Sequence, residues 1–419
     1  MTDASSQPKA AQDAVSDSVR GYDVVIVGGG IVGLSLACEL AGSEFSVAVV
    51  ERNELKAISE NQPDVRVSAI NRFALSRPAL AEAWQSELAQ RTCMYDRMFV
   101  WDLTGAGQIA FDSAELGISN LGAIVENNVL QKMLLDVVLK ADNINYLCPQ
   151  EITSIEYRST AEHSIITLAT GEKLSAELLV GADGLRSRVR EIADIPHSRK
   201  DYKQQGLVCN VTTSESHQNT AWQCFMPSGP LAFLPLYDGS SSIVWSLDDV
   251  TDAATEGASS AAEKMALDDE AFKQALAEAS EFKLGEILTL SQRYLFPLTH
   301  GHASDYIKPG LALIGDAAHN IHPLAGQGAN LGIADAATLA DIIIAAKKAG
   351  RQWSSQHTLA KYQRQRKGAN QLMEASMTGF KELFGNNNAM VSEIRNAGLS
   401  LVDNLPALKY RVIRQALGV

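Results

Sequence analysis

A strand, a glycine turn, a helix and a second strand follow one another between residues 22 and 51. The apolar run Tyr22–Val27 ends at Gly28-x-Gly30-x-x-Gly33, and residues with the apolar spacing of a packed helix come next. The run Ser46–Glu51 predicts the second strand. Glycines at this spacing permit a tight turn, and they let the backbone and the helix N-terminus approach a pyrophosphate closely. The pattern therefore predicts a βαβ unit that binds a nucleotide.

The acidic residue at the end of the second strand supports this interpretation. Glu51 stands 18 positions after Gly33, where a carboxylate accepts hydrogen bonds from the ribose hydroxyls of an adenosine. The alternative is a glycine turn that arose by chance, but both strands, the helix and the acid are all in place. The motif alone does not distinguish FAD from NAD.

Two further glycine segments follow short apolar runs much later in the chain. One is Gly181-Ala182-Asp183-Gly184, and the other begins at Gly315-Asp316 and continues through Pro323 to Gly326-Gln327-Gly328, before a long apolar helix. Taken alone, each aspartate could be only the N-cap of a turn or helix. The helix start after Gly328 favours function, because its N–H groups and positive dipole end can stabilise an anionic flavin ring. The three segments together indicate FAD.

The region between these segments has a different pattern. From residue 207 to 247, alternating strands and turns predict an antiparallel sheet. We therefore predict an α/β fold with a Rossmann-like FAD-binding domain, an inserted antiparallel-sheet substrate domain and a helical C-terminal region. The predicted boundaries are a disordered tail at 1–20, the FAD-binding domain at 21–190 and 291–345, the substrate domain at 191–290 and the helical region at 346–419.

Local patterns add several elements to this outline. We predict a hairpin with strands at 97–101 and 108–111, and a helix over 68–89 that breaks at Arg77-Pro78. Further helices are predicted over 129–140, 251–282 and 328–346.

Charge and cysteine usage restrict the class of partner. The net charge of −13 argues against a nucleic-acid surface. Residues 346–419 nevertheless carry 12 Lys and Arg against 4 Asp and Glu, which indicates either a contact with an anionic membrane or partner, or solvated helix faces. The five cysteines form no C-x-x-C pair, which indicates a reducing, cytoplasmic environment.

Metal binding is not predicted. His319 and His322 are three residues apart, but no third ligand stands at a supporting spacing. We expect these histidines to have a structural role or a role at the edge of the flavin.

The chain resembles the class A FAD-dependent aromatic hydroxylases, which share the p-hydroxybenzoate-hydroxylase-like fold. Within them it is most similar to the ubiquinone-biosynthesis hydroxylases (the UbiH, UbiF and VisC group), and especially to the 2-polyprenylphenol hydroxylase branch. The stretches that carry the resemblance are Asp23–Glu51, Arg66–Asn71, Ile124–Asn127, Gly181–Gly184, Leu231–Leu236 and Ala312–Gly332.

The resemblance implies roles at the cofactor. Asp316 would contact the ribityl chain or the pyrophosphate, Arg66 would lie near the cofactor, and Asp183 would lie between the pyrophosphate and the approach of the reductant. Asn127 departs from the family pattern, since many class A hydroxylases have a cofactor-contacting Arg there. The predicted cofactor-binding residues are Gly28, Gly30, Gly33, Glu51, Arg66, Asp183, Gly315, Asp316, Pro323, Gly326, Gln327 and Gly328.

The resemblance also implies a reaction. FAD would be reduced by NAD(P)H or another donor, would react with O₂ to a C4a-hydroperoxide, and would hydroxylate the ring of a polyprenylated phenol in ubiquinone biosynthesis. Only one strand–GxGxxG–helix unit is present, so a nicotinamide would bind transiently. No residue is singled out as a catalytic base. The aromatic and apolar residues Trp222, Phe225, Leu231 and Phe233 either wall a substrate pocket or belong to the core.

Other functions remain open at this stage. One alternative is a soluble aromatic hydroxylase, or another reaction of the fold, acting on a substrate without a prenyl chain. Another is a flavin-bearing subunit that holds a biosynthetic complex together. The expected partners are a polyprenylphenol lipid and, through the basic C-terminal region, the inner membrane surface and other ubiquinone-biosynthesis proteins. Homo-oligomerisation is left open.

Overall fold

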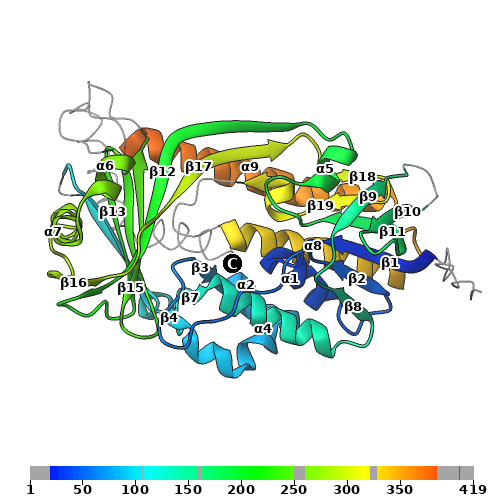
Figure 1. Cartoon of the computed structure of the whole chain (residues 1–419), viewed down its shortest axis with the longest axis horizontal. Coiled ribbons are helices and arrows are strands. Elements are labelled where there is room, and N and C mark those ends of the chain that lie inside the picture. Colours follow the sequence, from blue (N-terminus) through cyan, green and yellow to red (C-terminus); the bar gives the residue numbers. More distant parts are fainter. Residues whose placement is uncertain are drawn as a thin grey trace, which may run out of the picture.

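The structure is a computed structural model that describes residues 19–105, 107–158, 163–249, 260–320, 328–384 and 405. These residues form an elongated molecule with a mainly parallel sheet toward one end and an antiparallel sheet toward the other (Figure 1). Strands β12 (His197–Thr213) and β17 (Tyr294–Ala303) and helix α9 (Gln356–Phe384) extend along one side between the two ends. The α/β fold class is as predicted.

The parallel sheet contains the predicted βαβ unit. Its strand order is β18-β19-β11-β1-β2-β8, and the pairings from β19 to β8 are all parallel. The strands are β1 (Val19–Val27), β2 (Val47–Val50), β8 (Ile144–Leu147), β9 (Ile152–Glu156), β10 (Ser164–Leu168), β11 (Lys173–Gly181), β18 (Ile307–Lys308) and β19 (Leu311–Leu313). β1 and β2 are apolar runs because helices cover both faces of a parallel sheet.

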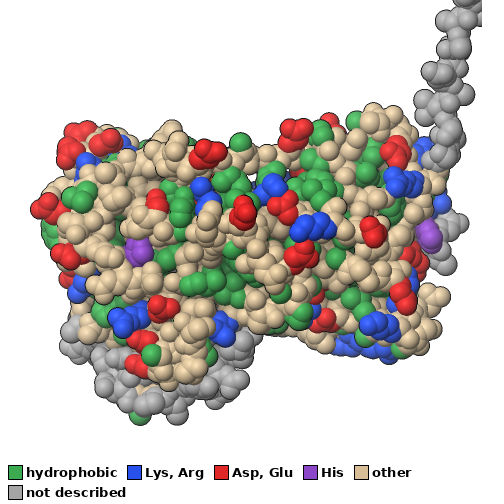
Figure 2. Space-filling view, turned by 90° about the horizontal axis from the view of Figure 1, so that it is seen from below, with side chains coloured by type: hydrophobic (Ala, Val, Ile, Leu, Met, Phe, Trp, Pro, Cys, Tyr) green, Lys and Arg blue, Asp and Glu red, His purple; other side chains and the backbone are tan. Residues whose placement is uncertain are grey.

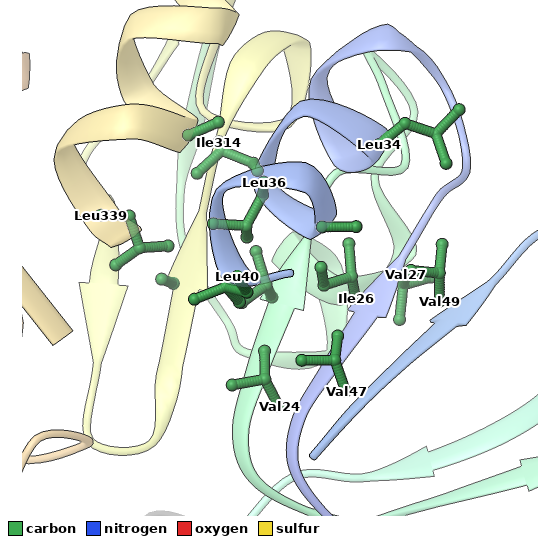
Figure 3. Close-up of a cluster of buried hydrophobic side chains, with 14 of the residues drawn as sticks. Val24, Ile26, Val27, Leu34, Leu36, Leu40, Val47, Val49, Ile314 and Leu339 are labelled. Atoms are coloured by element: carbon green, nitrogen blue, oxygen red, sulfur yellow. The ribbon is translucent and has the colours of Figure 1, made fainter. Parts of the chain in front are cut away.

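Helices α1 (Ile31–Leu40), α4 (Asn127–Lys140) and α8 (Gly328–Lys348) pack in this domain. Leu36 and Leu40 of α1 point into a fully buried core with Ile26 of β1 and Leu339 of α8 (Figure 3). Burial of each such side chain stabilises the fold by roughly 1.5–3 kcal/mol. Among the described residues, α8 alone has the length and apolar composition of a membrane span, but most of it is buried within the protein.

Helices α1 and α8 are in close contact at Gly332 of α8. A Cβ on Gly332 of α8 would lie 2.3 Å from Cγ2 of Val32 in α1. A Cβ on Gly315, which has φ +59° and directly follows β19, would lie 3.1 Å from both methyl carbons of the same valine. Val32 therefore occupies space that only glycines leave open. Its contacts fix α1, the turn at Gly315 and α8 relative to one another.

The antiparallel sheet has the order β20-β17-β12-β15-β14-β13-β5-β6, with β16 beside β12, and within it β13 and β5 pair in parallel. Its remaining strands are β5 (Arg97–Asp102), β6 (Gln108–Asp112), β13 (Thr220–Met226), β14 (Gly229–Pro235), β15 (Ser241–Asp248), β16 (Ile287–Leu290) and β20 (His319–Asn320). Helices α6 (Ala261–Ala266) and α7 (Asp269–Ala279) accompany it. The predicted hairpin is confirmed by the antiparallel pairing of β5 with β6.

The two faces of this sheet have different neighbours. On one face, Phe233 and Trp245 pack with Phe272 of α7. On the other face, Ala232 and Leu234 pack with residues of a small third sheet, formed by β3 (Val67–Asn71), β4 (Cys93–Tyr95) and β7 (Gly122–Glu126). This second face is called the cofactor-side face below, because β7 leads directly into α4 of the nucleotide domain.

The short helices lie mostly between β3 and β7. They are α2 (Arg72–Ser76), α3 (Pro78–Ala81), α5 (Arg188–Ile192) and the 3-10 turns η1 (Ala83–Gln85), η2 (Glu87–Arg91), η3 (Ala114–Leu116) and η4 (Gly315–Ala317). The helix predicted over 68–89 is wrong at its start, because Ser68–Asn71 pair with β7. Strand pairing with a distant segment there overrides the local helical pattern. The predicted break at Arg77-Pro78 is present.

Sheet membership also departs from the predicted domain boundaries. The β5–β6 hairpin falls within 21–190 and β17 falls within 291–345, yet both belong to the antiparallel sheet. The predicted tail at 1–20 lies outside the described residues except for Val19 and Arg20, which begin β1. Of the predicted helical region, residues 385–404 and 406–419 lie outside the described part.

The contact at Gly332 yields a stability prediction. Gly332→Ala places a methyl group against Val32, and such overpacking costs about 1–3 kcal/mol. Gly368→Ala in α9 is the matched control, because its Cβ would meet nothing within 4 Å, and it should stabilise the helix by about 0.5–1 kcal/mol. Urea denaturation of both variants measures the difference. Equal stability of the two would show that α1 and α8 are not in close contact.

Candidate cofactor and substrate site

The glycine turn has one position that faces open space. A Cβ on Gly28, which has φ +111°, would lie 2.4 Å from the carbonyl oxygen of Ala182, and one on Gly33 would lie 2.0 Å from that of Gly28. These two glycines are required by the packing of the turn itself. A Cβ on Gly30 would meet nothing within 4 Å. The turn therefore has an opening of the kind that a phosphate needs for close approach to the backbone.

The start of α1 adjoins this opening. Gly30 is the N-cap of α1, its carbonyl accepts from Leu34 N at 2.9 Å, and it has no side chain that could cap the first turn. The first N–H groups of a helix have no partner within the helix, and together with the helix dipole they attract an anion. This geometry fits the pyrophosphate of a dinucleotide.

Glu51 lies beside the turn, as the motif predicted. Its Oε2 accepts from Gly29 N at 2.7 Å and its Oε1 accepts from Asn53 N at 2.7 Å. Gln131 of α4 also reaches the turn and donates to Gly29 O at 2.6 Å. The sequence did not point to Gln131, because its contact joins segments far apart in the chain. Contact of Glu51 with a ribose stays a prediction.

Asp183 accepts hydrogen bonds at the start of a short helix whose N-cap is Ser187. Its Oδ2 accepts from Arg188 N at 2.7 Å and from Val189 N at 3.1 Å at the start of α5. The other oxygen, Oδ1, is buried and accepts no hydrogen bond. Burial raises the pKa of this carboxyl, although the hydrogen bonds from Ser187 and the backbone oppose the shift. Asp183 is therefore not the N-cap that the sequence left open, although it binds two N–H groups of the first helical turn, and one of its oxygens remains available.

The charge of Arg66 acts on Asp316, although the two residues are far apart in the chain. Desolvation raises the pKa of Asp316, and the charges of His319 and Arg66 oppose that shift. The side chain is nevertheless exposed. The Arg66 guanidinium lies 5.6 Å from the centre of the Phe296 ring.

A buried carboxylate in α8 holds the segment that carries Asp316. Oδ2 of Asp335 accepts from Gly315 N at 3.0 Å and from His319 Nε2 at 2.5 Å, and Oδ1 accepts from Arg366 Nε at 2.7 Å. Burial alone would raise the pKa of Asp335, but His319 and Arg366 outweigh it and the pKa lies below its ordinary value. A carboxylate inside an apolar helix was the sequence signal that could have identified this residue.

Three predicted residues of the flavin loop, Pro323, Gly326 and Gln327, lie outside the described residues, as does His322. Gly328 is described and begins α8. Their roles stay predictions.

The aromatic and apolar residues considered for the substrate pocket lie mostly in or against the core, which is the alternative that the sequence left open. Leu231 and Phe233 lie in the core beneath α6 and α7, and Trp222 packs against that same core. They are on the face of the sheet away from the cofactor domain. Phe225 lies on the opposite face, packed with Val100 and Ile109. Side chains alternate between the faces of a strand, and the sequence did not reveal which face is toward the cofactor.

Comparisons with known proteins agree with this geometry. A family model described as an FAD binding domain matches residues 80–376, and one for an NAD(P)-binding Rossmann-like domain matches residues 26–67. Escherichia coli 3-demethoxyubiquinol 3-hydroxylase is 36% identical over 95% of this chain and 98% of its own length. Ubiquinone hydroxylase UbiL of Rhodospirillum rubrum is 33% identical over 99% of this chain and 94% of its own length.

Solved structures show the same fold. The p-nitrophenol 4-monooxygenase of Pseudomonas putida superposes with a TM-score of 0.72 at 17% identity, covering 94% of this chain and 97% of that one. PqsL of Pseudomonas aeruginosa is described as a probable FAD-dependent monooxygenase. It superposes with a TM-score of 0.72 at 24% identity, covering 91% of this chain and 99% of that one.

The opening at Gly30 yields a binding prediction. Gly30→Ala should fold as the wild type does, because nothing lies near the added methyl group, but it should weaken FAD binding at least about tenfold, or roughly 1.4 kcal/mol. Fluorescence titration of FAD into the FAD-free variant measures the affinity, and thermal unfolding of the same sample checks the fold. An unchanged affinity would refute the placement of the pyrophosphate.

The buried carboxylate yields a second prediction. Asp335→Asn leaves the Arg366 charge buried without its partner and should cost about 3–5 kcal/mol of stability. Asp341→Asn in the same helix removes an exposed partner of Arg77 and should cost no more than about 1 kcal/mol. Urea denaturation at pH 7 compares the two.

The pH dependence follows from the lowered pKa of Asp335. The stabilisation by this carboxylate is fully present above the ordinary Asp pKa of about 3.9, and it is lost as the pH falls through the lower folded value. The stability of Asp335→Asn should therefore fall less steeply below about pH 4 than that of the wild type. Parallel acid unfolding curves would contradict this.

Proposed function

The chain belongs to the class A FAD-dependent aromatic hydroxylases, and on that basis we propose that it hydroxylates the ring of a polyprenylated phenol in ubiquinone biosynthesis. The observation that carries the proposal is the match to relatives with ubiquinone-pathway names along nearly their whole length. Human COQ6, described as a ubiquinone biosynthesis monooxygenase, is likewise 32% identical over 96% of this chain and 93% of its own.

The protein residues would bind the cofactor and keep water away from the ring. When bound, FAD supplies the electrons that activate O₂ for oxygen transfer to the ring, with NAD(P)H as reductant. The start of α1 and the opening at Gly30 would hold the pyrophosphate, and Glu51 would orient the ribose. Asp316 would bind the ribityl chain or the pyrophosphate, with the charge of Arg66 as the balancing charge.

The cofactor-side face of the antiparallel sheet suits an alkylated ring. Its described side chains at the small sheet include Ala221, Ala232 and Leu234, all nearly fully buried, with Val244 packed against them. They pack against Ala69 and Ile124 of the small sheet, so a ring that lies beside this cluster would meet an apolar border without unpaired polar groups. On the outside, hydrophobic side chains gather near the middle of one face, between the parallel and antiparallel ends (Figure 2), which supports contact with a lipid.

Some of the basic residues after residue 346 have partners within the fold. The excess of basic residues therefore supports a membrane contact only in part. Arg366 pairs with Asp335, Lys347 lies 3.3 Å from Asp23, and Lys367 donates to the backbone of Ser304. These side chains stabilise the fold. A contact with an inner membrane surface, or with other ubiquinone-biosynthesis proteins, would therefore rest on the remaining basic side chains.

The prenyl chain provides the test of the substrate. FAD-loaded protein is supplied with NAD(P)H, O₂ and phenols with zero, one, two or three isoprene units, and hydroxylated products are measured by mass spectrometry. Each buried CH₂ contributes about 0.8 kcal/mol, so kcat/KM should rise at least about tenfold from the unprenylated phenol to the longest one. Equal turnover would favour a soluble aromatic hydroxylase. Product formation from none of them would favour an assembly subunit.

A further inference from the structure

Part of the cofactor-side face of the antiparallel sheet is apolar and open to solvent. Leu207 of β12 packs in the core beneath α6 and α7, so Val208, the next residue, points to the cofactor-side face. Leu295 of β17 packs against the same core, so Phe296 also points to the cofactor-side face. Val244 of β15 is directly opposite Val208 and therefore shares that face. Val208, Val244 and Phe296 are called the open patch below.

The open patch differs from the rest of this face in its exposure. Phe296 is 37% exposed, and Val208 and Val244 are half-buried. By contrast, Ala232, which pairs with Val244 on the next strand, is 5% exposed and packs with the small sheet. The residue opposite Phe296 on β12 is Gly206, which has no side chain to cover the ring. Solvent therefore reaches the three side chains of the open patch, and a ligand can take the place of that solvent.

The open patch lies beside the candidate cofactor site. The Arg66 guanidinium is 5.6 Å from the centre of the Phe296 ring, and the charge of Arg66 acts on Asp316. The chain just before Arg66 is held against the same sheet, since Nδ2 of Asn210 donates to Pro63 O at 2.9 Å. A ligand on the open patch would therefore lie next to the segments that are expected to contact the FAD.

The chemistry of these surroundings favours an aromatic ring as the occupant. Phe296 offers its own ring, and two aromatic rings attract each other beyond the apolar area that they bury. The two valines supply apolar contact and leave no polar group unpaired. The positive charge of Arg66 favours the electron-rich face of a phenol. A purely aliphatic ligand would gain only the apolar contact.

We propose that the open patch binds the aromatic ring of the phenolic substrate, with the ring packed against Phe296, Val208 and Val244. A ring bound there removes the exposed part of the Phe296 side chain from water, which is favourable for both rings. The same ring would lie between the antiparallel sheet and the cofactor site, where oxygen transfer has to occur. The inference rests on the proposed function, because that function supplies the phenol.

Phe282 provides a matched control. It is also a phenylalanine with an exposed ring, 46% exposed. Its backbone N donates to Ala277 O of α7 at 2.8 Å, and α7 covers the opposite face of the sheet. Phe296→Ala and Phe282→Ala each remove a partly exposed ring, so the two variants should have similar thermal stability. They differ in the face from which the ring is removed.

The test measures binding of 2-prenylphenol, a probe with a single isoprene unit that needs no membrane. Its dissociation constant is obtained from the change in flavin absorbance of the FAD-loaded protein. Phe296→Ala should weaken binding by about tenfold, because the aromatic contact is lost, whereas Phe282→Ala should leave it unchanged. Val208→Phe fills the open space and should weaken binding at least as much, with thermal unfolding as the check on its fold.

Other occupants of the open patch would give different results. A fall in FAD affinity in Phe296→Ala, measured by titration of the FAD-free protein, would assign the patch to the cofactor and overturn the proposal. Weaker binding to anionic lipid vesicles with unchanged binding of 2-prenylphenol would assign it to a membrane surface and overturn it as well. An equal loss of the phenol in Phe282→Ala would show that the effect is not specific to this face.

The binding assay requires no turnover, so it is independent of the reaction. A protein that loses 2-prenylphenol only in the open-patch variants, but hydroxylates no prenylphenol, would lose the proposed function and keep the ring site.

Discussion

The contacts of the buried Asp335 carboxylate hold together the segments on which the candidate site depends. The carboxylate joins α8 to the turn at Gly315, to His319 and to Arg366 of α9. The same helix binds β3 through Asn330, which donates to Ala69 O at 2.7 Å and accepts from Asn71 N at 2.9 Å. A charge buried without partners would be strongly destabilising. The turn with Asp316, the strand after Arg66 and the C-terminal helix are therefore positioned by one helix.

The two faces of the antiparallel sheet have different roles: one face packs a core, and the other is directed toward the cofactor domain. The face beneath α6 and α7 is packed with large apolar side chains such as Phe233 and Trp245, which supply burial. The cofactor-side face has smaller side chains such as Ala232, and Asn210 and Ser242 border it with unpaired oxygens. Burying an unpaired oxygen lowers the stability of the fold. The burial of large apolar side chains on the opposite face offsets this loss.

The parts of the site that could be predicted from the sequence are those specified by local spacing. The glycine motif is one such part, since its three glycines lie within a few residues of each other. A Cβ would meet backbone atoms at Gly28 and Gly33 but nothing at Gly30. Asp335 could not be found in this way, because its partners His319 and Arg366 come from other segments. The choice between pocket and core for Leu231 and Phe233 could not be made from the sequence for another reason: alternation identifies two faces but does not show which one is toward the cofactor.

The order in which the chain is made does not match the order in which the site is completed. β1 is synthesised before its partners, yet β1 pairs with β11, β11 pairs with β19, and Asp335 pairs with Arg366. A nascent chain thus exposes the apolar strands of its nucleotide domain until β11 and β19 have left the ribosome. Domains that fold from distant segments fold slowly, and their exposed strands are prone to aggregate meanwhile.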